Sequence, residues 1–133
     1  MKQKLQKNRY FLEKQATTAD RVAMQLSQYV ENWRRIINLK SYVTAENRKP
    51  TNHELEQLKK YVTARDTARD KLFSALDSLH LYFEKETSDL SSSFRAWDEQ
   101  QSIKQTKDLP KTIEWQEKGR EILLSIRREM LDE

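Results

Sequence analysis

Apolar residues recur every three or four positions between about residues 3 and 47, which is the spacing of a helix with one apolar face. A heptad that starts at Leu5 makes most of the core positions apolar: Leu5, Leu12, Ala19, Val22, Leu26, Tyr29, Trp33, Ile36 and Val43. The flanking column of Ala16, Ala23, Val30 and Ile37 is apolar too, so the stripe is wider than a two-stranded coiled coil needs. The pattern predicts one long helix that packs against two neighbours.

A second helix is predicted to begin directly after Pro50, because proline disfavours a helical residue before it and lacks a backbone donor. Thr51 and Glu54 have the spacing of a capping box, in which each side chain accepts the other residue's amide. Such a short connection favours antiparallel neighbours. In that hairpin, residues whose numbers add to about 99 face each other, which pairs Leu26 with Phe73, Ala23 with Leu76, Ala16 with Phe83 and Leu5 with Phe94.

The same register places two arginines of the second apolar seam, Arg65 and Arg69, near Trp33 and Glu31. An aromatic face and a carboxylate are both favourable partners for a guanidinium group. We therefore expect a polar layer in which at least one arginine reaches one of these two residues.

The second apolar pattern continues to about residue 103, but residues 87–93 are rich in serine and threonine. These residues compete for their own backbone hydrogen bonds and are poor in helix interiors. We expect a kink or break there. A last helix, about residues 110–131, is predicted from Pro110 in its first turn and from the apolar series Trp115, Ile122, Leu123, Ile126 and Met130.

Composition narrows the possible functions. The chain of 133 residues has one Gly, no Cys and two His, so glycine-rich phosphate loops, thiol chemistry and cysteine zinc sites are excluded. Its length suits a single domain, residues 1–133. The predicted fold is all-α, an elongated antiparallel hairpin or bundle of three to four helices with coiled-coil-like heptads.

Side chains for catalysis or metal binding are few. Asp77, His80 and Glu84 have a spacing that puts them on one helix flank, but a di-iron bundle site needs a second carboxylate and histidine set, which is missing. No Ser, Asp or Glu joins a histidine in a catalytic signature. We expect no enzyme activity, no metal and no cofactor; a metal-binding or small-ligand-binding bundle remains a second alternative.

Positive charge is concentrated in residues 1–50, which hold eleven basic and four acidic residues. Five of these basic residues form an outward row along the first helix: Lys7, Lys14, Arg21, Arg34 and Arg35. Such a row could bind nucleic acid or an anionic membrane surface. Because Glu13, Asp20 and Glu31 interrupt it, a solvated helix face is the preferred interpretation, and any binding should be weak and salt-sensitive.

The preferred function is a non-catalytic interaction or scaffold module. The last helix is too short to cover the whole hairpin, so we expect an apolar stripe near Pro50 to stay bare and to form a homodimer; it comprises Trp33, Ile36, Ile37, Val43, Leu55, Leu58 and Tyr61. The alternative is that a break in the second helix lets a fourth helix fold back and bury this stripe within one chain.

The order of the predicted elements resembles the soluble helical domains that bacterial single-span proteins carry beside their membrane anchor. This is a resemblance of architecture and rests on no diagnostic motif. We expect a cytoplasmic location, because no signal-peptide apolar core follows the basic start; the resemblance implies a membrane-associated one if an anchor precedes residue 1.

Overall fold

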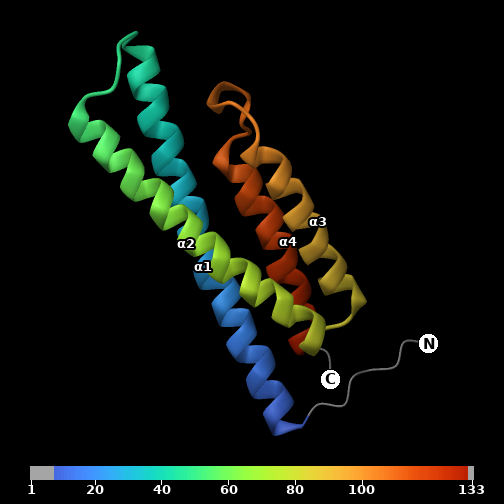
Figure 1. Cartoon of the computed structure of the whole chain (residues 1–133). Helices are drawn as coiled ribbons and strands as arrows, with labels where there is room; N and C mark the ends of the chain where they lie inside the picture. Colours follow the sequence, from blue (N-terminus) through green and yellow to red (C-terminus); the bar gives the residue numbers. More distant parts are fainter. Residues whose placement is uncertain (1–7, 132–133) are drawn as a thin grey trace.

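The computed structural model describes residues 8–131, and these form an all-α bundle of four helices. They are α1 (Arg9–Ala45), α2 (Asn52–Tyr82), α3 (Lys85–Ser102) and α4 (Thr112–Leu131), with a short 3₁₀ turn, η1 (Thr106–Asp108), before α4. Figure 1 shows α1 and α2 as a long antiparallel hairpin, against which α3 and α4 pack as a second, shorter pair. The predicted all-α helical bundle is confirmed.

Local signals fix the starts of both hairpin helices. The Asn8 side chain accepts the amide of Phe11 at 2.8 Å and so caps the start of α1. Both hydrogen bonds of the capping box between Thr51 and Glu54 are formed, at 2.9 and 3.1 Å. Arg48 then binds the Glu54 carboxylate with two nitrogens, at 2.6 and 2.9 Å, which ties the connection to the start of α2.

The second helix breaks earlier than predicted. It ends at Tyr82, and Phe83 and Glu84 are extended before α3 begins at Lys85, so the serine-rich residues 87–93 lie inside a helix. The expected break at 87–93 is therefore wrong, because tertiary contacts stabilise both sides of the earlier break. Gln15 of α1 donates to the Tyr82 carbonyl at 2.8 Å, and Glu129 of α4 accepts the Glu84 amide at 2.7 Å.

Small polar residues of α3 allow α4 to approach closely. Thr87 and Ser91 are buried, and the Thr87 hydroxyl contacts both Ser125 and Glu129 of α4. The last helix forms as predicted, although Pro110 precedes its first residue, Thr112, instead of lying in the first turn.

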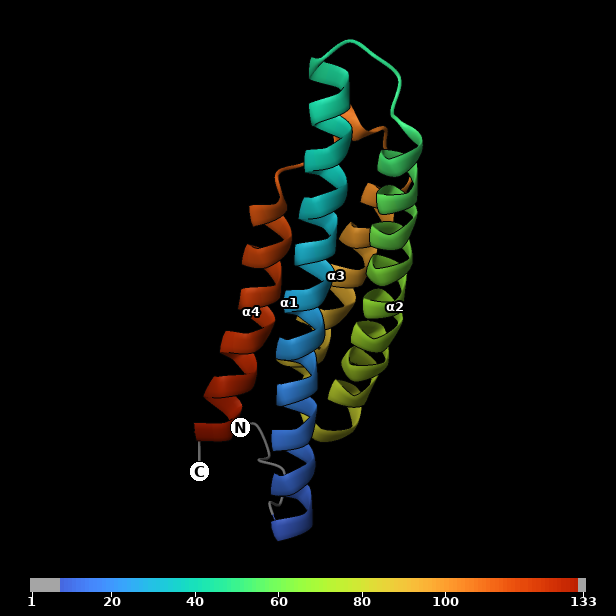
Figure 2. The same ribbon diagram turned by 90° about the vertical axis from the view of Figure 1, so that its left-hand side faces the viewer.

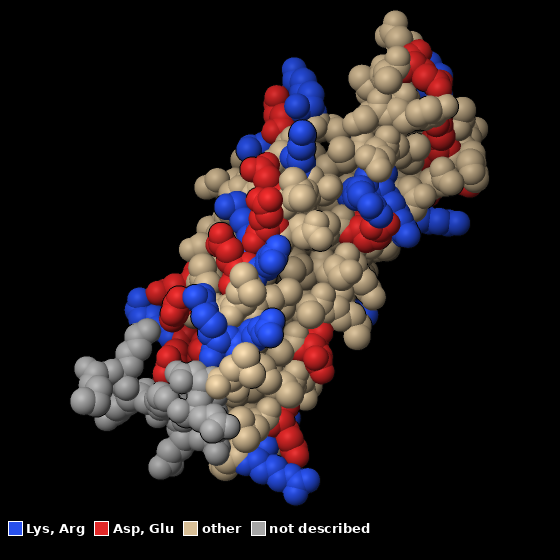
Figure 3. Space-filling model, turned by 180° about the vertical axis from the view of Figure 1, so that it is seen from behind, with Lys and Arg blue, Asp and Glu red and all other residues tan. Residues whose placement is uncertain are grey.

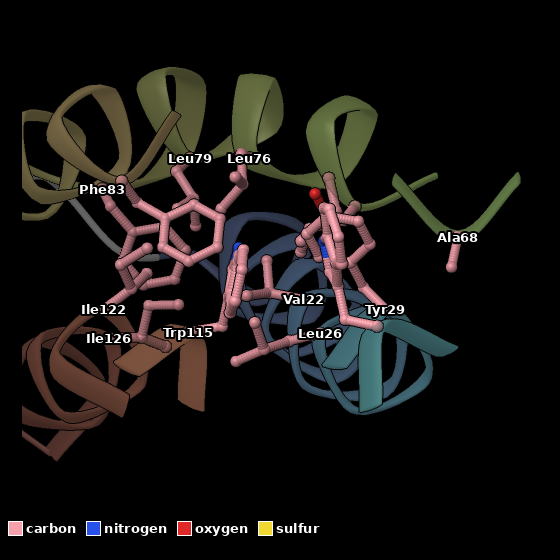
Figure 4. Close-up of a cluster of buried hydrophobic side chains, with 14 residues drawn as sticks. Val22, Leu26, Tyr29, Ala68, Leu76, Leu79, Phe83, Trp115, Ile122 and Ile126 are labelled. Atoms are coloured by element: carbon pink, nitrogen blue, oxygen red, sulfur yellow. The ribbon is translucent and has the colours of Figure 1, made fainter. Parts of the chain in front are cut away.

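One core joins the four helices (Figure 4). Its buried members are Val22, Leu26, Tyr29, Trp33, Ala68, Leu72, Ala75, Leu76, Leu79, Phe83, Phe94, Trp115, Ile122 and Ile126. Gly119 is needed where α4 meets α1, because an added Cβ would lie 2.2 Å from the Leu26 Cδ2 atom. Phe94 belongs to α3 and not to the second helix of the hairpin, and its predicted partner Leu5 lies outside the described residues.

Candidate interaction surfaces and the polar centre of the bundle

A buried carboxylate connects all four helices. Asp98 of α3 accepts hydrogen bonds from the Tyr29 hydroxyl of α1, from the Trp115 Nε1 of α4 at 2.9 Å and from the Arg69 Nε of α2 at 3.0 Å. Burial, followed by the nearby Asp98 charge, raises the pKa of Tyr29 well above its ordinary value. Both carboxylate oxygens accept hydrogen bonds from protein donors, so Asp98 links α3 to each of the other three helices.

The predicted contact of at least one arginine with Trp33 or Glu31 is confirmed. The Arg65 guanidinium lies over the Trp33 ring at 4.6 Å, as the hairpin register requires. Arg69 instead pairs with Asp98, which sequence reasoning missed. A signal existed: Thr87, Ser91, Phe94, Asp98 and Gln101 repeat at three- and four-residue spacing and are the buried residues of α3. It becomes visible only once α3 is treated as a separate helix.

Trp33 is covered within its own chain, so the expectation that it stays bare is wrong. Its ring stacks on Trp115 at 4.8 Å between centroids and is only 5% exposed. Trp97 meets the edge of Trp115 at 5.1 Å, and Lys118 lies over Trp97. The break after Tyr82 explains why Trp33 is covered. It separates α3 from α2, so α3 and α4 can pack against the hairpin and form a four-helix cross-section that extends as far as Trp33.

The other six residues of the expected stripe lie toward the hairpin end. Ile36 and Val43 are buried, Ile37, Leu58 and Tyr61 are partly buried, and Leu55 is 48% exposed. Val43 and Leu58 line a shallow pocket of about 350 Å³ between the hairpin end and η1. Figure 2 shows the turn between α1 and α2 projecting beyond the connection from α3 to α4. Of the seven residues of the expected stripe, only Leu55 is exposed.

The basic row does not form one continuous surface. Arg34 and Arg35 both pair with Glu31, and the hydrogen bond from Arg34 holds the pKa of Glu31 below its ordinary value. Arg35 lies over the Tyr61 ring of α2, whereas Arg34 lines the groove between α1 and α4. Figure 3 shows acidic side chains among the basic ones on the back of the molecule.

Lys14 and Arg21 complete the described part of this row. Both side chains are exposed, and Lys14 lies over the Tyr10 ring at 5.3 Å. Lys7 lies outside the described residues. The described residues thus provide separate basic groups, some of them already neutralised.

The side chains considered for a metal site are not brought together. Glu84 lies beyond the end of α2, so the shared flank expected for Asp77, His80 and Glu84 is wrong. Asp77 pairs with Arg95 of α3. Within residues 8–131, no group of three or more His, Asp or Glu side chains is placed to hold a metal ion. In the same part of the chain, no helix is long and apolar enough to cross a membrane.

Comparison with protein-family models, curated proteins and solved structures found no match to this chain.

Proposed function

We propose that this protein is a non-catalytic helical interaction module that binds a protein partner through the projecting end of the α1–α2 hairpin. The observation that carries the proposal is the contrast in cover along the hairpin: Trp33 is enclosed by α4, whereas the hairpin end has an exposed Leu55 and an open pocket lined in part by Val43 and Leu58. Exposed apolar groups beside an apolar pocket are typical of protein-binding surfaces.

The chemistry of the hairpin end favours a partner with an apolar anchor and a polar rim. Leu39, Val43 and Leu58 supply apolar lining, and Lys40 with the Arg48–Glu54 pair supplies charges of both signs at the edge. Arg48 is held by Glu54, so the edge is already ordered before a partner binds. A preordered surface loses less conformational entropy on binding.

Site-specific photo-crosslinking tests this proposal. A photoreactive phenylalanine derivative at Leu55 should trap one partner, which mass spectrometry then identifies, whereas the same group at the exposed Lys71 of α2 should not. Binding of the purified partner should weaken at least roughly tenfold in Leu55→Glu, because a carboxylate would have to be desolvated in the interface. Equal trapping at both positions, or unchanged affinity in Leu55→Glu, would contradict the proposal.

Anion binding by α1 is less well supported, because Glu31 already neutralises Arg34 and Arg35. Homodimer formation through the whole predicted stripe loses Trp33, since this residue is enclosed within one chain. The proposed binding of a protein partner at the hairpin end requires neither anion binding nor a homodimer.

A further inference from the structure

α4 has a second apolar stripe on the side that faces away from the core. Trp115 and Ile122 form part of its inward face and are buried. Ile113, Leu124 and Leu131 are 52%, 45% and 70% exposed. Their spacings of eleven and seven residues are close to whole numbers of helical turns, so they share the outward face.

Exposed charges stand between these apolar residues. Glu117 and Arg127 are exposed, and neither forms an ion pair within residues 8–131. They cannot pair with each other inside one straight helix, because ten residues separate them by about 15 Å. Arg120, also exposed, lies between Glu117 and Leu124 along the helix.

The stripe lies between two shallow grooves. One groove runs between α1 and α4 and includes Ile113 and Leu123. The other runs between α3 and α4 and includes Leu90, Leu124 and Leu131. The outer face of α4 is therefore a ridge with apolar surface on both sides.

We infer that the outer face of α4 binds the α4 of a second copy of this chain, with the two helices antiparallel. The register in which facing residue numbers add to about 244 places Ile113 of each chain against Leu131 of the other. It also places Glu117 against Arg127, twice by symmetry, and the aliphatic stem of Arg120 against Leu124. This one register thus brings apolar residues against apolar residues and opposite charges together, and each contact occurs twice, as a two-fold interface requires.

The antiparallel direction follows from the charges. In a parallel pair, Glu117 would face Glu117 and Arg127 would face Arg127, and like charges repel. The contact extends over a helix of about 30 Å, which makes a small interface. We therefore expect a weak dimer, with a dissociation constant on the order of 10–100 μM.

This surface is separate from the hairpin end, so the dimer and the proposed function can fail independently. A charge swap tests the dimer by sedimentation equilibrium from about 5 to about 500 μM protein. Glu117→Arg and Arg127→Glu should each weaken the dimer roughly tenfold, because symmetry creates two repulsive pairs. The double variant should restore dimerisation to within about threefold of the original chain, since both pairs re-form with the charges exchanged.

Glu99→Arg is the matched control, because it makes the same charge change at an exposed position of α3. It should leave the dimer unchanged. All substituted positions are exposed, and circular dichroism should show unchanged helicity and melting in every variant.

Engineered cysteines give a second, independent measurement, since the chain has no cysteine of its own. A mixture of Ile113→Cys and Leu131→Cys chains should form a disulfide-linked heterodimer on mild oxidation. Either variant alone should not, because its two cysteines would be about 27 Å apart, far beyond disulfide reach.

Three results would overturn the inference. The chain could remain monomeric over the whole concentration range. A dimer could form without responding to the charge changes on α4, which would place its interface elsewhere. A disulfide formed by Leu131→Cys alone would show that the helices are parallel.

Discussion

Around Asp98 the molecule has a four-helix cross-section, whereas the turn of the α1–α2 hairpin projects beyond the connection from α3 to α4 (Figure 2). In the first region, each helix contributes one group to a shared polar centre, and large apolar residues fill the space around it. In the second region, the hydrogen bonds that fix the turn are local ones, such as the Arg48–Glu54 pair and the capping box.

The difference shows two ways in which this chain stabilises helices. Contacts between residues far apart in the sequence stabilise the four-helix region, so its stability should depend strongly on single buried residues. Local capping and ion pairs fix the hairpin end, so its stability should respond weakly to substitution and more to pH and salt. A weakly stabilised, exposed end is available for binding without loss of the core.

Loss of the Asp98 carboxylate should have the largest effect. Asp98→Ala would leave the buried donors of Tyr29 and Trp115 without their acceptor and Arg69 without its partner. Removing one member of a buried charged network costs about 3–5 kcal/mol. Urea unfolding should show this loss, whereas Asp89→Ala, at an exposed position of the same helix, should cost less than about 1 kcal/mol. Similar costs for both would mean that the polar centre does not hold the helices together.

A pair of leucines on α2 compares the two regions directly. Leu76 is fully buried in the four-helix core, whereas Leu55 is 48% exposed at the hairpin end. Leu76→Ala should reduce the free energy of unfolding by about 2–5 kcal/mol. Leu55→Ala should change it by about 0.5 kcal/mol or less. If Leu55→Ala proved equally costly in a monomer, the hairpin end would be packed more tightly than its exposure indicates.

Local sequence signals were sufficient for the hairpin. The spacing of apolar residues, the proline and the capping residues each influence only the few residues next to them in the chain. They correctly predicted the capping box and the turn at Pro50. The contact of Arg65 with Trp33 followed from the same geometry. The helical class and the antiparallel hairpin could therefore be predicted from residues close together in the chain.

The four-helix region could not be predicted in the same way. The break at Phe83 and Glu84 depends on Gln15 and Glu129, which come from helices far away in sequence. A sequence read without that break assigns Asp98 to the second helix, and no residue near Asp98 in the sequence indicates its contacts with Tyr29 and Trp115. Of the candidate interface, Leu55 and Leu58 were placed correctly near the open end, but the cover over Trp33 depends on the same unpredicted break.

Gly119 tests how closely the four-helix region is packed. In Gly119→Ala, the new methyl group would overlap Leu26, whose side chain would have to change rotamer or push α1 away. Overpacking of this kind costs about 1–3 kcal/mol, partly offset by the higher helix propensity of alanine. Thermal unfolding should show a lower Tm.

The double variant Gly119→Ala with Leu26→Ala should lose less stability than the sum of the losses in the two single variants, because Leu26 is the residue that the new methyl group overlaps. Additive losses would place the strain elsewhere.

The smallest effect should come from the Arg48–Glu54 pair at the hairpin end, and it should depend on pH. Hydrogen bonds, first from Arg48 and then from the Thr51 amide, lower the pKa of Glu54 from 4.5 to about 2. A carboxylate with a lowered pKa in the folded state stabilises that state above its unfolded pKa, and this stabilisation is lost as the pH falls from about 4.5 toward 2. Glu54→Gln can still cap the helix but has no charge. The Tm of this variant should therefore lie below that of the original chain at pH 7, and the difference in Tm should narrow by pH 3 and in high salt.

Glu56→Gln, an exposed neighbour without an ion pair in the described part of the chain, is the control and should show no such narrowing. A difference in Tm that stays constant from pH 7 to pH 3 would show that this end, like the four-helix region, is held by packing and not by charge.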